Sequence, residues 1–392
     1  MKRRVLVVDQ APNLGGTLFG MYELVRMLDR DRYEPVVAFC EQHPMEERFR
    51  DLGAEVVHLI EGTPPRRRTM KPRNDRASLI NGLASLTRYE IACARGVARI
   101  IRSHGIDLVH HNNHLPRDRS CVIATALRRV PQICHIHNLR RLAPEVKFAA
   151  RFVDKFVYMS KAIERVYLDC GIAPERGTVI YDGIDAPVDS GHSIRAELGL
   201  DASDFVVANV GRIDTWKGHD IFVRAVASLV PRIPRIKAVI AGEVSDTARR
   251  AGFDVALVRL VEELGVDVVF AGFREDVPRL MAAADIIVHS ATEPEPFGRV
   301  IAEGMIAGRP VIATNAGGVP EIIDDRVSGL LVPCGDVAAL ADAMAYLHDH
   351  PAEARLLAEE GRRRAAQRFA PARFASEMMA VYDGVLRVAQ QA

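Results

Sequence analysis

Two glutamates eight residues apart, Glu295 and Glu303, are the residues of this chain whose types and spacing best suit chemistry. Pro294 and Pro296 place Glu295 in a loop, whereas Glu303 falls inside a helix predicted for residues 298–308. A loop carboxylate and a helix carboxylate at this spacing can face one pocket at two depths. They would accept hydrogen bonds from several hydroxyl groups of one ligand. As an isolated pair they would be ordinary surface charges, because short motifs match by chance.

The elements around this pair predict a ligand site. An apolar run at residues 284–290 predicts a buried parallel strand, and another strand is predicted at residues 311–313. In such strand–loop–helix–strand units a ligand lies beyond the carboxyl end of the strand and faces the helix N-terminus. The backbone N–H groups of Phe297, Gly298 and Arg299 would be the unpaired donors there, suited to a sugar hydroxyl or a phosphate oxygen.

Arg212 and Lys217 form a second candidate set, at the predicted end of one strand and the start of the next helix. Two such cations would converge on a multiply charged anion, although each by itself could be a solvated loop charge. The sequence shows no G-x-x-x-x-G-K-[ST] and no metal-ligand cluster. We therefore expect these cations and backbone dipoles to neutralise the anion without a divalent metal or other cofactor.

The first half of the chain carries two further polar sets. Gly15 and Gly16 separate a strand predicted at residues 5–8 from a helix predicted at residues 18–29, so the backbone can approach an anion there. His135 and His137 alternate along a strand predicted at residues 131–138 and face the same side. Each could bind a sugar hydroxyl or be a hydrogen-bonded structural histidine.

Taken together, these residues resemble family 4 of the retaining nucleotide-sugar glycosyltransferases, the group 1 family with the GT-B fold. The resemblance is dense over residues 272–336, in the stretches 295–298, 308–311, 317–321 and 329–336 together with Glu303. It implies that Gly15 and Gly16, with Arg212 and Lys217, hold the donor diphosphate. The segment Thr17-Leu-Phe-Gly20 departs from the family pattern after the glycines.

The resemblance also implies roles for the remaining residues. Glu295 would position the transferred sugar and Glu303 the ribose. The backbone at Phe273 and Arg274 would contact the nucleobase. His137 would lie near the transferred sugar, with His135 as the alternative.

The fold class that follows is α/β: a GT-B protein with two Rossmann-like doubly wound domains facing across a cleft. We expect an acceptor-binding domain over residues 1–187 and a domain that binds the sugar nucleotide over residues 188–370. Residues 371–392 would form a C-terminal helix that packs back on the first domain. The length of 392 residues fits two domains. The alternation of predicted strands and helices, which includes a strand at residues 179–185 and a single helix at residues 247–264, fits this layered class.

Composition argues against several other classes of protein. The net charge of +1 gives no argument for a nucleic-acid partner. The six cysteines contain no C-x-x-C and predict reduced thiols in a cytoplasmic protein. The first apolar run ends after four residues, which favours a strand over a signal peptide, and no segment is long and apolar enough to span a bilayer.

Residues 63–76 form a basic, proline-broken stretch with two open interpretations. It is either a solvated insertion or a patch for anionic phospholipids or a lipid-linked acceptor, which would give peripheral association with the inner face of the membrane.

The sequence thus predicts a retaining glycosyltransferase that moves a hexosyl group from a UDP- or GDP-sugar to a glycan or lipid-linked hydroxyl acceptor. Polysaccharide, glycolipid or cell-envelope glycan biosynthesis is the expected setting. A GT-B nucleotide-sugar 2-epimerase and a non-catalytic sugar-nucleotide-binding protein are the alternatives. A dinucleotide dehydrogenase is disfavoured, because Gly15-Gly16 does not begin a G-x-G-x-x-G.

Overall fold

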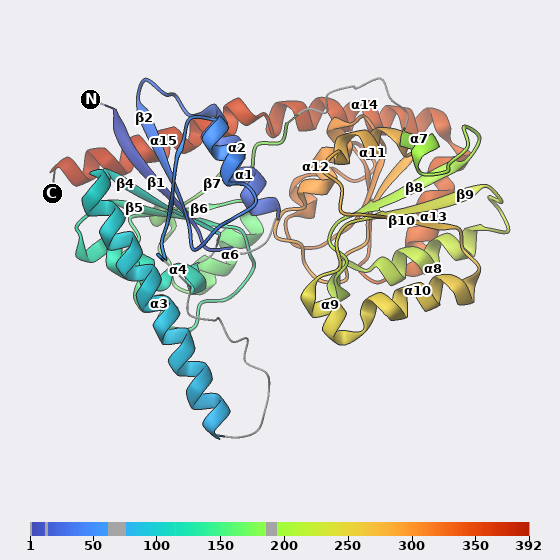
Figure 1. Cartoon of the computed structure of the whole chain (residues 1–392). Coiled ribbons are helices and arrows are strands. Elements are labelled where there is room, and N and C mark those ends of the chain that lie inside the picture. Colours follow the sequence, from blue (N-terminus) through green and yellow to red (C-terminus); the bar gives the residue numbers. More distant parts are fainter. Residues whose placement is uncertain (1, 12–14, 62–75, 114, 186–193, 392) are drawn as a thin grey trace. The chain divides into compact units, whose positions relative to one another are not determined.

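The computed structural model describes residues 2–11, 15–61, 76–113, 115–185 and 194–391, with the backbone alone for residues 76–86 (Figure 1). The chain forms two compact units. Unit 1 comprises residues 1–183 and 371–392, and unit 2 comprises residues 184–370. The predicted domain boundary at residue 187 and nearly all of the basic stretch 63–76 lie outside the described residues.

Unit 1 alternates strands and helices along the chain and ends with the C-terminal helix of the protein. Its elements are β1 (Arg3–Asp9), α1 (Gly16–Met27), β2 (Tyr33–Phe39), α2 (Glu46–Asp51), β3 (Glu55–His58), α3 (Arg76–His104), β4 (Leu108–Asn113), α4 (Leu115–Leu127), β5 (Gln132–Ile136), α5 (Pro144–Ala150), β6 (Lys155–Tyr158), α6 (Lys161–Asp169), the 3-10 turn η1 (Pro174–Arg176), β7 (Gly177–Val179) and α15 (Pro371–Gln391).

The sheet of unit 1 is parallel, in the order β3-β2-β1-β4-β5-β6-β7, and helices cover both of its faces. Side chains of β1 alternate between the two faces, as in any strand. Val5 and Val7 pack with α1 and α15, whereas Leu6 and Val8 pack with α3. Because neither face meets water, the strand is a continuous apolar run, as expected for a parallel sheet.

The C-terminal helix α15 belongs to the core of unit 1, although more than 180 residues separate it from the rest of that unit. The Tyr382 hydroxyl lies 2.7 Å from Nδ1 of His110 on β4. The Tyr33 hydroxyl at the start of β2 donates to Asp383 over 2.5 Å. Figure 1 shows α15 running beside α1 and the strands of this unit.

Unit 2 repeats the alternation with a smaller sheet. Its elements are α7 (Ile194–Glu197), β8 (Phe205–Val210), the 3-10 turn η2 (Thr215–Lys217), α8 (His219–Leu229), β9 (Ile236–Ala241), α9 (Asp246–Ala251), α10 (Phe253–Leu264), β10 (Val268–Gly272), α11 (Val277–Ala283), β11 (Ile286–His289), α12 (Arg299–Ile306), β12 (Val311–Thr314), the 3-10 turn η3 (Val319–Glu321), β13 (Leu330–Val332), α13 (Val337–Asp349) and α14 (Pro351–Arg368).

The sheet of unit 2 is also parallel, in the order β10-β9-β8-β11-β12-β13. Residues of α8, α10 and α13 pack on one face, and α12 lies against Ile287 on the other (Figure 1). In both sheets the strand order reverses once, between β1 and β4 and between β8 and β11. Crevices beyond the carboxyl ends of the strands at such reversals are where open α/β sheets bind ligands.

Two predicted elements need correction. The helix predicted as one piece over residues 247–264 is two helices, because Gly252 adopts a left-handed conformation (φ +68°) that ends α9 and starts α10. The strand predicted at residues 179–185 is only Gly177–Val179, and the following residues continue without strand structure. All six cysteines are free, and four of them are buried, as the composition predicts. In the described part of the chain, no helix combines the length and apolarity that a membrane crossing needs.

Candidate functional site

In unit 2, the two predicted sets of charged residues meet at the reversal of strand order. Lys217 lies in η2 after β8, and Glu295 lies in the loop after the neighbouring strand β11. The Lys217 Nζ donates to Glu295 Oε2 over 2.5 Å. Their side chains are only 19% and 12% exposed. The anion-binding cation and the hydroxyl-binding carboxylate predicted from separate motifs therefore belong to one cluster.

A histidine completes this cluster. His289, the last residue of β11, places Nε2 3.1 Å from the same Glu295 Oε2. Its Nδ1 lies 3.3 Å from the hydroxyl of Thr314, the last residue of β12. The indole ring of Trp216 lies 4.1 Å from the Lys217 Nζ, so the ammonium has a cation–π contact as well. Glu295 is thus held by Lys217, which follows β8, and by His289 at the end of β11, and Thr314 of β12 contacts His289.

The charge of Glu295 follows from these contacts. Burial by itself raises the pKa of the carboxyl group, but the positive charge of Lys217 and the hydrogen bond from His289 outweigh it and lower the pKa to about 2. The side chain is therefore an anion at neutral pH and can only accept hydrogen bonds. A ligand hydroxyl is a suitable donor to it.

Hydrogen bonds to backbone carbonyls fix the loop that contains Lys217 against the loop that follows β11. The Thr292 N–H donates to the Trp216 carbonyl over 2.8 Å, and the Ser290 hydroxyl donates to the Gly218 carbonyl over 2.8 Å. Gly218 has φ +65°, and a Cβ there would lie 2.0 Å from the Ser290 carbonyl oxygen. Only glycine accommodates both the left-handed backbone and this close approach.

Two further glycines, Gly317 and Gly318, pack against the backbone of Glu295. The Gly318 N–H donates to the Glu295 carbonyl over 2.8 Å. Gly317 has φ +66°, and a Cβ there would lie 2.1 Å from the same carbonyl oxygen. The Gly-Gly pair in the stretch 317–321 is therefore explained by its packing against the Glu295 backbone.

The structure places the other predicted residues of this loop and helix as follows. Gly298 immediately precedes α12, and Arg299 is its first residue. The Phe297 side chain is buried, with its ring 5.4 Å from that of Phe369, so it packs in the protein interior. Glu303 is 27% exposed and pairs with Arg299 over 3.5 Å.

Three predicted donor residues lie outside the Lys217–Glu295 cluster. Arg212 is 51% exposed and lies 3.9 Å from Asp214, so its guanidinium faces solvent and can turn toward an anion. Phe273 is exposed, whereas Arg274 is held by Asp276 at 2.7 Å and Glu197 at 2.8 Å. Those hydrogen bonds raise the pKa of Arg274, and its side chain is committed to the protein. The prediction of a backbone contact at Phe273 and Arg274 remains untested.

In unit 1, the predicted residues follow β1 and β5. Gly15 precedes α1 and Gly16 is the first residue of that helix, so the glycines lie at a helix N-terminus as predicted. His137 Nε2 lies 3.2 Å from the side-chain oxygen of Asn112 on β4. His135 and His137 do face the same side, with ring centroids 4.0 Å apart.

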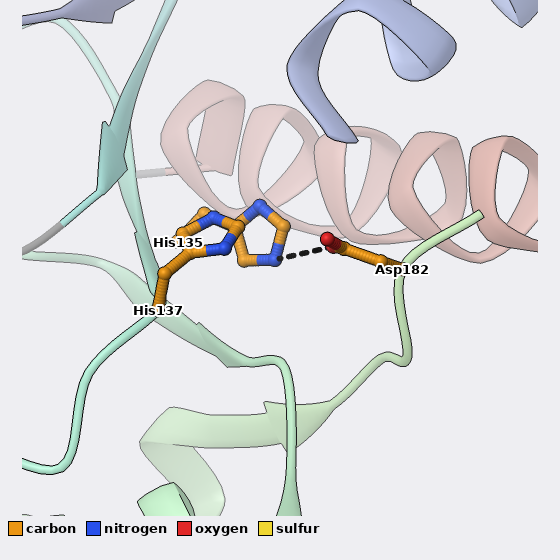
Figure 2. A group of neighbouring side chains, drawn as sticks. All are labelled: His135, His137 and Asp182. Carbon is orange, nitrogen blue, oxygen red and sulfur yellow. Dashed lines mark ion pairs between the residues drawn. The ribbon is translucent and has the colours of Figure 1, made fainter. Parts of the chain in front are cut away.

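A carboxylate that the sequence did not associate with these histidines lies beside them. Asp182, after β7, is fully buried, and its Oδ1 is 3.9 Å from Nε2 of His135 (Figure 2). One potential ligand atom from each of His135, His137 and Asp182 lies within 4.8 Å of the others. The sequence showed no metal-ligand spacing, so this grouping is a product of the fold. Ligand atoms around a tetrahedral zinc ion are only about 3.3 Å apart, so the three side chains would have to move together to hold one.

His289 and Asp182 are the polar residues that the sequence analysis missed. His289 had a usable signal, because it lies near the end of the buried strand predicted at residues 284–290 and Glu295 lies in the loop that follows. Asp182 had none, because its neighbours His135 and His137 lie more than 40 residues earlier in the chain.

Comparison with known proteins assigns the chain to a family. Residues 192–364 match the family described as "Glycosyl transferases group 1". Residues 14–187 match the one described as "Glycosyltransferase Family 4". The chain belongs to the group 1 glycosyltransferases. The resemblance seen in the sequence is therefore confirmed.

Individual relatives of this group 1 glycosyltransferase agree with the assignment. D-inositol 3-phosphate glycosyltransferase of Saccharomonospora viridis is 31% identical over 287 residues, which are 71% of this chain and 64% of that protein. The protein of the same name from Mycobacterium sp. (strain JLS) is 37% identical over 196 residues, 48% of this chain and 43% of that protein. The matched part of the chain thus spans 64% and 43% of the lengths of these two relatives.

Solved structures show that this group 1 glycosyltransferase is of the GT-B type. Anabaena HepE, in complex with UDP and glucose, matches with a TM-score of 0.79 and 25% identity, over 97% of this chain and 99% of that chain. Sucrose-phosphate synthase from Thermosynechococcus elongatus matches with a TM-score of 0.76 and 22% identity, over 99% and 100% of the two chains. The predicted fold of two parallel-sheet Rossmann-like domains is confirmed.

Proposed function

We propose that this group 1 glycosyltransferase transfers a hexosyl group from a UDP- or GDP-sugar to a hydroxyl acceptor with retention of the anomeric configuration. The observation that carries the proposal is the Lys217–Glu295 pair, with His289 behind it, at the strand reversal of unit 2. This cluster offers a cation for phosphate and a fixed anion for sugar hydroxyls within one small volume. The solved complexes of Anabaena HepE with UDP and with UDP-glucose support a sugar-nucleotide donor.

Each residue of the proposed donor site has a role that its chemistry allows. Lys217 and the exposed Arg212 bind the diphosphate, because an ammonium and a guanidinium are strong donors to phosphate oxygens. Glu295 accepts hydrogen bonds from the hydroxyls of the transferred sugar. Glu303 accepts them from the ribose hydroxyls, with its partial exposure leaving room for that contact. The backbone N–H of Gly298, at the start of α12, supplies a further donor.

The reaction needs stabilisation of charge more than proton transfer by the protein. The bond from the sugar C1 to the diphosphate oxygen breaks, and a bond from C1 to the acceptor oxygen forms on the same face. The acceptor proton passes to the leaving diphosphate, so the products are a glycoside and a nucleoside diphosphate. Negative charge grows on the leaving group during this step, and Lys217 and Arg212 stabilise it.

Unit 1 is the acceptor-binding unit in this proposal, and it also carries groups for the donor diphosphate and the transferred sugar. Gly15 and Gly16 offer backbone N–H groups at the start of α1, where a helix N-terminus favours an anion. His137, held by Asn112, is the better candidate for a contact with the transferred sugar. His135 lies deeper in the unit, beside Asp182, His110 and Phe374.

No divalent metal takes part in the proposed mechanism, because side-chain cations and backbone dipoles meet the charge of the donor. A glycan or lipid-linked acceptor, and a cytoplasmic reaction near the membrane, belong to the same proposal. They rest on the family resemblance and on the basic composition of residues 63–76.

A donor screen followed by product analysis tests the proposal. UDP-, GDP- and ADP-sugars are compared by thermal shift, since a bound ligand raises the melting temperature according to its affinity. The stabilising donor is then incubated with candidate acceptors, and the anomeric configuration of the product is determined by NMR. Epimerised donor without glycosylated acceptor would show the 2-epimerase instead. An inverted product would refute retention, and the absence of any turnover would refute the enzyme assignment.

A further inference from the structure

We propose that His289 is a positioning residue that holds Glu295 in place when Lys217 turns from Glu295 to the donor diphosphate. The inference rests on the proposed function, since it assigns a role within the same donor site. It adds a step to that function: donor binding exchanges an ion pair inside the protein for one with the ligand.

The starting observation is that two groups bind one carboxylate oxygen. Lys217 Nζ and His289 Nε2 lie 2.5 Å and 3.1 Å from Glu295 Oε2. Lys217 follows β8 and is the last residue of a short 3-10 turn, with a long and flexible side chain. His289 ends the buried strand β11 and is only 4% exposed. Of the two partners, the lysine is therefore the one that can move.

The diphosphate of a sugar nucleotide competes with Glu295 for Lys217. It carries more negative charge than one carboxylate and offers several acceptor oxygens, so the ammonium gains by turning toward it. Glu295 would then lose the cation that most favours its ionised form. When a buried carboxylate loses a partner, its protonated form and other rotamers become more favourable. Either change would disturb its contact with a sugar hydroxyl.

His289 can keep Glu295 ionised and in the same rotamer after Lys217 has turned away. Thr314 lies 3.3 Å from Nδ1, and a threonine hydroxyl can donate a hydrogen bond to an unprotonated ring nitrogen. With Nδ1 as the acceptor, the ring proton of a neutral imidazole sits on Nε2 and points at Glu295 Oε2. Thr314 ends β12 and is buried, so the orientation of the ring is fixed by the sheet and not by the donor.

The neighbouring strand β11 also carries the link to the Lys217 loop. Ser290, the residue after His289, donates to the Gly218 carbonyl, and Thr292 N–H donates to the Trp216 carbonyl. The backbone on both sides of Lys217 is therefore tied to the segment that contains His289. Exchange of the ion pair then requires movement of the lysine side chain alone, while His289 and Glu295 keep their positions.

The test compares variants that remove the Nε2–H donor with variants that keep it. His289→Leu removes the hydrogen bond, and His289→Gln places an amide N–H at a similar reach. Binding of UDP and of GDP is measured by calorimetry. The constants kcat and KM are measured with whichever of UDP-glucose, UDP-galactose, UDP-N-acetylglucosamine and GDP-mannose the parent protein turns over. For His289→Leu we expect kcat to fall about ten- to a hundredfold with nucleotide Kd unchanged, because only the sugar contact is disturbed. His289→Gln should recover most of the loss.

A second pair of variants guards against a folding defect at position 289. Thr314→Val removes the hydroxyl that sets the imidazole proton, and Thr314→Ser keeps it. Thr314→Val should lower kcat about three- to tenfold with nucleotide Kd unchanged, and Thr314→Ser should match the parent. Parental kcat in both His289→Leu and Thr314→Val would overturn the inference, as would equal losses in His289→Gln and His289→Leu. A parent without turnover on any donor would instead refute the proposed function, so the two failures are distinguishable.

Discussion

Lys217 and Glu295, separated by 78 positions in the chain, form a largely buried ion pair with Nζ and Oε2 2.5 Å apart. Each has a ligand group to bind in the proposed reaction, and in the free protein each satisfies the other. The pair keeps both charges tolerable in a poorly solvated place, since removing one partner of a buried pair leaves the other charge uncompensated. The free energy of donor binding therefore includes the cost of breaking this contact.

Replacing Lys217 by alanine should raise the donor KM and lower kcat by about a hundredfold or more, because the variant loses a cation at the leaving diphosphate. Steady-state kinetics with the identified donor measure both constants. Lys237→Ala is the matched control, because Lys237 lies on β9 and pairs with Asp267 outside the cluster. Parental kinetics for Lys217→Ala would contradict the assignment of Lys217 to the diphosphate.

The pH dependence of stability should report the ionised state of Glu295. Its pKa falls from an ordinary value near 4.5 to about 2 in the folded protein, although burial alone acts in the opposite direction. A depressed carboxyl pKa stabilises the fold above the unfolded-state value, and this contribution, up to about 3 kcal/mol, is lost as pH falls from about 4.5 to about 2.

Glu295→Gln is the variant for this measurement, because its amide does not titrate. Urea unfolding of parent and variant between pH 2 and pH 7 should show a stability difference that is constant above about pH 5 and shrinks below it. A difference that stays constant down to pH 2 would show that the folded-state pKa of Glu295 is not depressed.

Alanine at Gly317 should destabilise the protein and displace Glu295. Its φ of +66° is unfavourable to alanine, and the new Cβ would meet the Glu295 carbonyl oxygen at 2.1 Å. We expect a loss of about 2–4 kcal/mol in the free energy of unfolding, together with reduced kcat. Gly335→Ala is the control, because Gly335 has a similar φ of +75° and open space around its Cβ position. Equal losses in the two variants would mean that backbone conformation alone matters at Gly317.

The two histidines of β5 and its following loop should separate by kinetics and stability. His137→Ala is expected to lower kcat about a hundredfold with a small change in unfolding free energy, as for a group that contacts the transferred sugar. His135→Ala should cost about 2–3 kcal/mol of stability, because its ring fills space among His110, Phe374 and Asp182. The reverse pattern, measured by kinetics and urea unfolding, would make His135 the sugar-contacting residue.

Activity should not depend on a divalent metal. Dialysis against EDTA and then assay with the identified donor should leave kcat within about twofold of its starting value, because Arg212 and Lys217 carry the positive charge. Loss of activity that Mg²⁺ or Mn²⁺ restores would contradict this mechanism. Inhibition by added Zn²⁺ that disappears in Asp182→Asn would show that His135, His137 and Asp182 can close around an ion.

Much of the fold could be predicted from local patterns in the sequence. Short apolar runs separated by helical segments indicate buried parallel strands, and glycines mark the turns that follow them. The helix predicted over residues 247–264 is where this approach went wrong. A glycine inside a helical pattern is usually tolerated, and nothing nearby in the sequence shows that Gly252 takes φ +68° and divides α9 from α10.

By itself the sequence determined the two-part α/β class and the membership of Lys217, Glu295 and His137 among the functional candidates. Lys217 and Glu295 follow predicted strands, and His137 lies near the end of one. The strand ends at one edge of a parallel sheet are where such side chains gather. Only the tertiary structure decided their partners. Lys217 meets Glu295 and His289 because β8 lies next to β11, and Asp182 meets His135 because the chain after β7 returns to β5. Strand order is set by crossover connections and by packing of helices on both faces, which no local pattern of residues contains.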